Sequence, residues 1–283
     1  MVTDWTNAIC EESKLRPRDW LLGMGLWPLK LHATASAAAA DIQALTAQRC
    51  LHVLDGGIYE PDHLDPTRQL ANHGEADACS QRAGSTGLPR EVARCDRAPR
   101  QRGMQLRGRA TAETGRPPIL GLGQRRDQAD EDVPAAPVSL EVRENVRTAT
   151  LKPLIVAKVK GGSQFFTDAY NIDHCTKADY DHRTVNHGAG EYARRDPDGA
   201  CVHCNTMEGI WSGLRNFLDR FKGISQRFLH LRVGRYECLP NHGHLHWGQT
   251  FEAALQYIFS TTGDYLRWMA HQHRRMPLTL CYR

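Results

Sequence analysis

The clearest pattern of hydrophobic and polar positions in this chain begins just after Asn205. Large apolar residues recur there every three or four positions, which is the period of one face of an α-helix. We therefore expect an amphipathic helix whose apolar side chains pack on a core. The apolar stripe consists of Met207, Ile210, Trp211, Leu214, Phe217, Leu218 and Phe221.

Shorter elements are expected ahead of that helix. Residues 138–159 alternate between extended and helical signals, and Gly161-Gly162 then breaks the chain. The apolar run that ends in Thr167-Asp168 reads as a buried strand. Ligands gather at strand ends in open α/β sheets, so Asp168 is a candidate site residue, although such an aspartate can also simply cap a turn.

At the other end of the chain, Pro17 precedes an apolar run and predicts the first turn of a helix, as the start of a small helical bundle. Residues 60–164 contain no Phe, Trp or Tyr, although these make up 7% of the sequence. Aromatic side chains dominate core burial, so we expect residues 34–137 to be poorly ordered or non-native. The many arginines there could form a nucleic-acid-binding arm, or they could come from a shifted reading frame.

The amino-acid composition restricts the class of protein only loosely. The 283 residues carry a formal charge of +4 and a pI near 8.6, which suits nucleic acid without requiring it. The nine irregularly spaced cysteines indicate thiols in a reducing cytoplasm rather than a secreted disulfide scaffold. The apolar runs are shorter than the roughly 18 to 20 residues that span a bilayer, so we expect no membrane partner.

The start of the predicted helix could carry chemistry. Asn205, Glu208 and Arg215 can point the same way, and a strand-borne Asp168 facing them would offer the oxygen ligands that magnesium prefers. Two such ions drive phosphodiester cleavage, with Arg215 near the phosphate. In the alternative, purely structural interpretation, Asn205 caps the helix and Glu208 favours its dipole.

Several short motifs occur in a fixed order: Thr167-Asp168, then Thr184-Val185-Asn186-His187 before Gly190-Glu191-Tyr192, and then a run from His203 to Ser212. This series resembles the bacterial insertion-sequence transposases of the ISXO type. The resemblance covers roughly residues 151–241 and, more weakly, 11–27. It implies an α/β, ribonuclease-H-like mixed sheet flanked by helices, which cleaves and transfers DNA strands with Mg²⁺ or Mn²⁺. Its partners would be transposon ends and target DNA, bound by a homo-oligomer.

Carried over by residue, the resemblance makes Asp168 the second catalytic acid and Asn205 the third metal ligand, with Glu208 competing for or supporting that position. Arg215 stands where the family usually has lysine, which keeps the charge but changes its geometry. The family's first catalytic aspartate is not evident, and Asp55 and Asp77 are poor substitutes by their neighbours. Without that acid we expect activity to be severely weakened or lost.

Two further sites are expected from the residues. Cys201, His203 and Cys204 form a knuckle that could hold structural zinc, which would make the chain a non-catalytic, zinc-stabilised nucleic-acid-binding protein instead. Basic residues after the long helix alternate with apolar ones and could contact a DNA backbone, or they could form an ordinary solvated face. The basic candidates are Arg220, Lys222, Arg227 and Arg232.

These patterns divide the chain into four parts. Residues 1–33 would be a helical N-terminal remnant, and residues 34–137 the segment without aromatics. Residues 138–241 would be the catalytic half-domain, and residues 242–283 a C-terminal tail.

Overall fold

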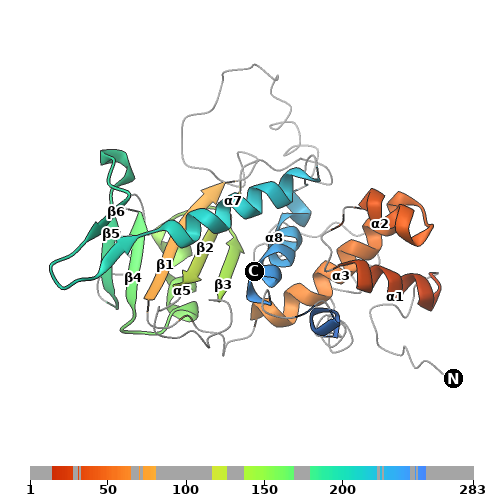
Figure 1. The fold of residues 1–283 in the computed structure, drawn as a ribbon, viewed down its shortest axis with the longest axis horizontal. Helices are drawn as coiled ribbons and strands as arrows, with labels where there is room; N and C mark the ends of the chain where they lie inside the picture. The colour runs from red at the N-terminus through yellow and green to blue at the C-terminus, as the bar shows by residue number, and fades with distance from the viewer. Residues whose placement is uncertain are drawn as a thin grey trace, which may run out of the picture. The chain divides into compact units, whose positions relative to one another are not determined.

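The computed structural model divides the chain into two compact units (Figure 1). One consists of Met1–Asp65 and Gly234–Cys281, and the other mainly of Pro66–Val233. The structure describes residues 15–27, 31, 33–64, 70, 73–80, 117–125, 137–168, 179–221, 224, 226–242, 246 and 248–252.

The first unit is helical. It contains α1 (Pro17–Leu26), α2 (Ala33–Ala40), α3 (Ala44–Leu64) and the second half of α8 (Gln226–Asn241). Pro17 occupies the first turn of α1, where its missing N–H costs nothing, so the helix start predicted from the sequence is confirmed. The core of this unit is made by Trp20, Met24, Trp27, Cys50, Leu51, Val53, Leu54 and Cys238.

A buried polar cluster lies inside the helical unit. The Asp55 side chain is fully buried and accepts a hydrogen bond of 2.8 Å from Trp27 Nε1. Arg235 Nη1 lies 3.8 Å from the same carboxylate oxygen, and Arg235 Nη2 donates to the backbone carbonyl of Trp27. These partners offset the cost of burying the Asp55 charge.

The second unit is built on a five-stranded sheet in the order β3-β2-β1-β4-β5. The strand β1 pairs parallel with β4 and antiparallel with β2; β4 and β5 are parallel, and β2 and β3 antiparallel. β1 is therefore the central strand. The strands are β1 (His73–Ser80), β2 (Pro118–Gln124), β3 (Val138–Val142), β4 (Gln164–Asp168) and β5 (Asp181–Val185).

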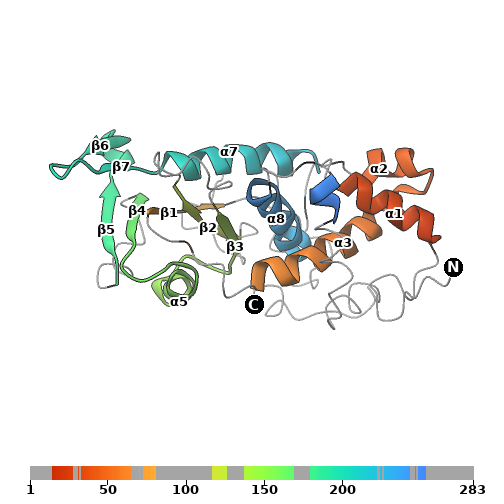
Figure 2. The same cartoon turned by 60° about the horizontal axis from the view of Figure 1, so that its bottom comes forward.

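Helices cover both faces of this sheet, with α5 (Thr148–Lys158) on one side and α7 (Asn205–Asp219) on the other (Figure 2). The α5 face is an apolar core that includes Ala76, Leu120, Leu122, Leu151, Ile155 and Phe165. On α7 the stripe predicted from the sequence is confirmed, because Met207, Trp211, Leu214, Phe217 and Leu218 are buried.

Two glycines bring α7 close to the sheet. A Cβ atom on Gly121 would lie 2.2 Å from Met207 Cε and 2.6 Å from the Trp211 ring, and one on Gly123 would lie 2.9 Å from Met207 Sδ. No side chain fits at such distances in a close-packed interior. The bare surface of β2 thus sets how near the Trp211 indole lies to β1.

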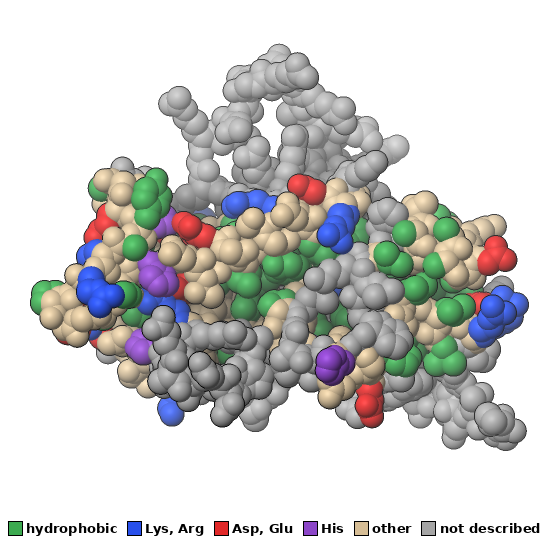
Figure 3. Space-filling view, in the orientation of Figure 1, with side chains coloured by type: hydrophobic (Ala, Val, Ile, Leu, Met, Phe, Trp, Pro, Cys, Tyr) green, Lys and Arg blue, Asp and Glu red, His purple; other side chains and the backbone are tan. Residues whose placement is uncertain are grey.

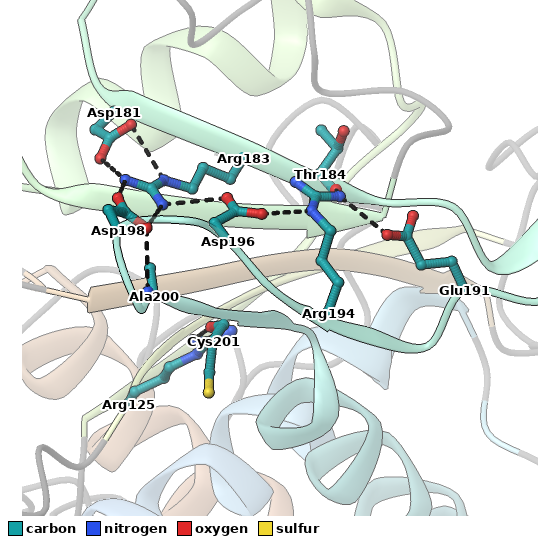
Figure 4. Close-up of polar contacts among 10 residues, drawn as sticks. All are labelled: Arg125, Asp181, Arg183, Thr184, Glu191, Arg194, Asp196, Asp198, Ala200 and Cys201. Atoms are coloured by element: carbon teal, nitrogen blue, oxygen red, sulfur yellow. Dashed lines mark hydrogen bonds and ion pairs between the residues drawn. The ribbon is translucent and has the colours of Figure 1, made fainter.

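A small antiparallel pair, β6 (Ala193–Arg195) and β7 (Cys201–His203), follows β5. Arginines and carboxylates bind it to β5 (Figure 4). Arg183 contacts Asp181, Asp196 and Asp198 at 2.6–3.1 Å. Hydrogen bonds from the Arg183 guanidinium hold the pKa of Asp198 at about 2, well below its usual range.

This mixed α/β arrangement confirms the ribonuclease-H-like fold class expected from the sequence. The central region differs in part from our expectation, because the described parts of residues 34–137 contain α2, α3, β1 and β2. Ile119, Leu120 and Leu122 of β2 are essentially fully buried. Both β1 and β2 pair with a neighbouring strand on each side, and this pairing stabilises segments that contain no Phe, Trp or Tyr. The arginine-rich residues 81–116 lie outside the described residues.

None of the described helices is long and apolar enough to cross a membrane.

Candidate active site on the central strands

Two aspartates lie side by side on neighbouring strands. Ala76 of β1 is in register with Thr167 of β4, so Asp77 and Asp168 follow at matching positions. Side chains in register on adjacent strands point to the same face of a sheet, here the face that α7 covers. Burial raises the pKa of Asp77; the hydrogen bonds from Trp211 and Ala78 partly oppose that rise, and the negative charge of Asp168 adds a smaller one.

The Asp77 carboxylate is fixed on both oxygens. Trp211 Nε1 of α7 donates to Oδ2 at 2.9 Å, and the backbone N–H of Ala78 donates to Oδ1 at 2.7 Å. Trp211, which the sequence suggested only for packing, therefore also orients a carboxylate. Each oxygen keeps a further lone pair for a ligand.

His187 connects the strand acid to the helix. It belongs to a short 3₁₀ turn after β5, His187–Ala189. Its Nδ1 lies 3.6 Å from Asp168 Oδ2 and 3.8 Å from Glu208 Oε1, which is within ion-pair range but too long for hydrogen bonds. The structure thus brings Asp77, Asp168, Glu208 and His187 to one end of the sheet. In Figure 3, histidine and acidic side chains gather over β5 and the start of α7.

The start of α7 is anchored by Glu75, two residues before Asp77. Its carboxylate is fully buried and accepts hydrogen bonds from the Met207 N–H and the Thr206 hydroxyl, both at 3.0 Å. A carboxylate at a helix N-terminus satisfies an otherwise unpaired amide and suits the helix dipole. Glu75 therefore takes the capping role that the sequence suggested for Asn205.

Arg125, just after β2, completes this anchor. Its Nε donates to Glu75 at 2.6 Å, and its other nitrogens donate to the carbonyl oxygens of Cys201 and His203. The guanidinium also lies 3.7 Å from the centre of the Phe166 ring. One buried ion pair thus connects β1, β2, β7 and the first turn of α7.

The other expected site residues on α7 are exposed. Asn205 is the first residue of the helix, and its backbone amide donates a hydrogen bond of 3.3 Å to His203 Nδ1. The N-cap position is Cys204, which makes no side-chain capping bond. Arg215 lies farther along α7, and its charge acts on Cys79 of β1. Our predicted roles for Asn205 and Arg215 are untested by this geometry.

The expected DNA-contacting residues differ in their positions. Arg220 is exposed at the end of α7, Lys222 lies outside the described residues, and the Arg227 side chain is not described. Arg232 is only 3% exposed, with its guanidinium carbon 4.9 Å from the centre of the Phe221 ring. The predicted DNA contact of Arg232 stays a prediction, and this burial gives it less support than the exposed Arg220 has.

The three residues of the cysteine knuckle, Cys201, His203 and Cys204, lie in different surroundings. Cys204 is buried with Phe166, Val185 and Val202, and burial raises its thiol pKa. Cys201 is exposed, and His203 Nδ1 lies 3.2 Å from Glu75; burial and Arg125 lower the His203 pKa. Within the described ranges, no three His, Cys, Asp or Glu residues form a group that could hold one metal ion.

Sequence reasoning set Asp77 aside because its neighbours lack a tyrosine and a glycine pair. One signal could have found it: Glu75 and Asp77 are two residues apart, so in a strand they share one face. Asp55, the other substitute considered, belongs to the helical unit and its buried cluster.

The mixed sheet flanked by helices is that of a ribonuclease-H-like core, and two aspartates lie on its neighbouring parallel strands beside a helix that carries a glutamate. The comparison with protein families agrees: the ISXO2-like transposase domain matches residues 94–236, just over half of the chain. The chain belongs to this family of insertion-sequence transposases. Searches of curated proteins and of solved structures found no match.

Proposed function

We propose that this protein cleaves and transfers DNA strands at the ends of an insertion sequence, with a divalent metal ion held between Asp77 and Asp168. The observation that carries the proposal is the register of β1 and β4, which puts these two carboxylates side by side. Asp77 then supplies the first acid that its neighbours in the sequence do not reveal, and Asp168 the second.

The residues present suit Mg²⁺ or Mn²⁺. Burial raises the pKa of Asp77, and the negative charge of Asp168 adds to that rise; a bound cation would stabilise both carboxylates in their charged form. Magnesium commonly uses only one or two protein carboxylates and completes its octahedron with waters and substrate phosphates. Such an ion would stabilise the charge on the attacking and leaving oxygens of an in-line displacement.

The protein's own groups would prepare this site. Trp211 and the Ala78 amide hold Asp77 in one orientation, and Glu75 fixes the start of α7 so that Glu208 faces Asp168. Asn205 and Glu208, at the start of α7, are the candidates for a third oxygen ligand. Arg215, exposed on the same helix, would contact the phosphate backbone, and Arg220 would extend that contact.

The test is metal-dependent nicking and strand transfer on DNA that carries the element's terminal repeats. We expect Asp77→Asn and Asp168→Asn to lower the rate by about 10²-fold or more, because ligand loss removes several kcal/mol of transition-state stabilisation. Asp219→Asn, at the exposed end of the same helix, is the control and should cut normally. DNA binding without any cutting by the wild type would refute catalysis and indicate a decayed transposase.

The same proposal implies that the protein acts on DNA in the bacterial cytoplasm, and that an oligomer brings two element ends together. Sedimentation with and without end DNA would measure the oligomer. Stoichiometric zinc in the purified protein would favour the alternative zinc-stabilised nucleic-acid-binding protein over this one.

A further inference from the structure

An aromatic ring stands in solvent beside the acidic site. Tyr192 is 62% exposed, and it is among the few large hydrophobic residues with so much exposed surface in the described part of the chain. Its ring centre lies 5.3 Å from that of His187, with the two planes tilted by 34°. Because His187 in turn lies near Asp168 and Glu208, Tyr192 is one side chain away from the carboxylates.

The loop that carries Tyr192 is held firmly at both ends. Asn186 Oδ1 accepts a hydrogen bond from the Ala189 amide, and the Asn186 carbonyl accepts one from the Glu191 amide. Gly190 has a φ of 80°, a conformation that favours glycine and turns the chain sharply. The exposed ring is therefore presented by a tight, internally bonded turn.

The charges next to the ring are paired with each other. Arg194 Nη1 lies 3.3 Å from Glu191 Oε1, Arg194 Nε lies 2.7 Å from Asp196, and Arg194 also donates to the Thr184 carbonyl (Figure 4). Glu191 in addition accepts from the Asn186 amide. These charges are engaged within the protein, so the ring offers stacking more than ionic attraction.

We propose that Tyr192 is a stacking platform for a nucleobase next to the phosphate that is cut. This inference rests on the proposed function. A phosphate held at Asp77 and Asp168 carries its bases one sugar away, which brings a flanking base to the neighbourhood of the ring. Stacking on an aromatic side chain suits any base, and an unpaired base at a strand end pays least to leave the duplex. The ligand class is therefore an unpaired nucleotide at the element end.

The experiment places 2-aminopurine, whose fluorescence falls on stacking, at successive positions around the cleavage site of the terminal repeat. Full-length protein is added with Ca²⁺ in place of Mg²⁺ or Mn²⁺, because Ca²⁺ also binds oxygen ligands but with looser geometry, so that the DNA end can bind while cutting is suppressed. We expect quenching at one flanking position with the wild type and with Tyr192→Phe. Tyr192→Ala and Tyr192→Leu should lose it and bind the frayed end about 5- to 150-fold more weakly. Because the side chain is exposed, these variants should keep their fold, which circular dichroism verifies.

Equal quenching and affinity in wild type and Tyr192→Ala would overturn the inference. So would a change of oligomeric state in Tyr192→Ala without a change in quenching, because the ring would then pack on a second copy. The proposed function is read out separately: if the wild type cuts and Tyr192→Ala behaves identically, only the stacking role fails. If the wild type neither binds nor cuts the repeats, the transposase chemistry fails as well.

Discussion

The buried carboxylate of Glu75 should have a large effect on both stability and catalysis. It is fully buried, pairs with Arg125 at 2.6 Å, and satisfies the Met207 amide and the Thr206 hydroxyl at the start of α7. In Glu75→Ala, the Arg125 side chain, only 12% exposed, loses its ion-pair partner and the helix loses its cap. Breaking a buried pair from one side costs about 3–5 kcal/mol, a large fraction of a typical domain's 5–15 kcal/mol.

The milder variant Glu75→Gln separates the two roles. Its amide oxygen can still accept a hydrogen bond at the helix start, but it carries no charge for Arg125, so we expect a loss of about 1–3 kcal/mol. Urea denaturation measures the stability. Hydrogen exchange of peptides covering residues 205–211 measures the anchoring of α7, and exchange should accelerate there first.

The matched control is Glu141→Gln on β3. Glu141 is similarly buried, at 3% exposed, but lies on the edge strand of the sheet; its Oε2 is 2.7 Å from Nη2 of Arg143, the residue just after β3. It should lose stability without changing metal-dependent cleavage, whereas Glu75→Gln should lower cleavage at temperatures where the protein is still folded. A loss below about 1 kcal/mol in Glu75→Ala, with unchanged exchange at 205–211, would refute the anchoring role.

Two further substitutions and one labelling reaction test how the residues around the site pack. Gly121→Ala should lower the free energy of unfolding by about 1–3 kcal/mol and slow DNA cleavage, because the added methyl group would collide with Met207 and Trp211. An unchanged denaturation midpoint in urea would contradict this. Trp211→Phe keeps an aromatic side chain but removes the N–H donor to Asp77 on β1. Cleavage, measured by single-turnover kinetics, should fall about 10- to 100-fold; an unchanged rate would contradict the orienting role of Trp211. Burial raises the pKa of Cys79 to about 12, so at pH 8 only about one Cys79 thiol in 10⁴ is ionised. Iodoacetamide should therefore label the exposed Cys201 far faster than Cys79, which mass spectrometry measures. Equal labelling of the two cysteines would contradict this.

The parts of the fold that the sequence predicted are those with strong local signals. The apolar stripe of α7 and the strand ending at Asp168 each depend on residues close together in the chain. Their side chains meet near His187, which has contacts to both Asp168 and Glu208. Periodicity and strand-end position were enough to find this half of the site.

The part of the candidate site that lies on β1 could not be predicted from nearby residues, because β1 lacks the usual composition of a strand. The strand from His73 to Ser80 has no β-branched or large apolar residue, and it is a strand because β2 and β4 pair with both its edges. The capping of α7 was also non-local, since Glu75 lies 132 residues before Met207. Only the folded structure shows that Glu75 and Asp77 of β1 contact α7.

The position of β1 has a consequence for how this domain can be cut out of its gene. The family match begins at residue 94, after β1 has ended. An expression clone trimmed to residues 94–236 would omit the strand between β2 and β4 and leave two separate edge pairs, β3-β2 and β4-β5. Each would expose unpaired backbone groups that invite aggregation, and the clone would carry no Asp77. A soluble fragment therefore has to start before His73, in the stretch that composition alone would advise discarding.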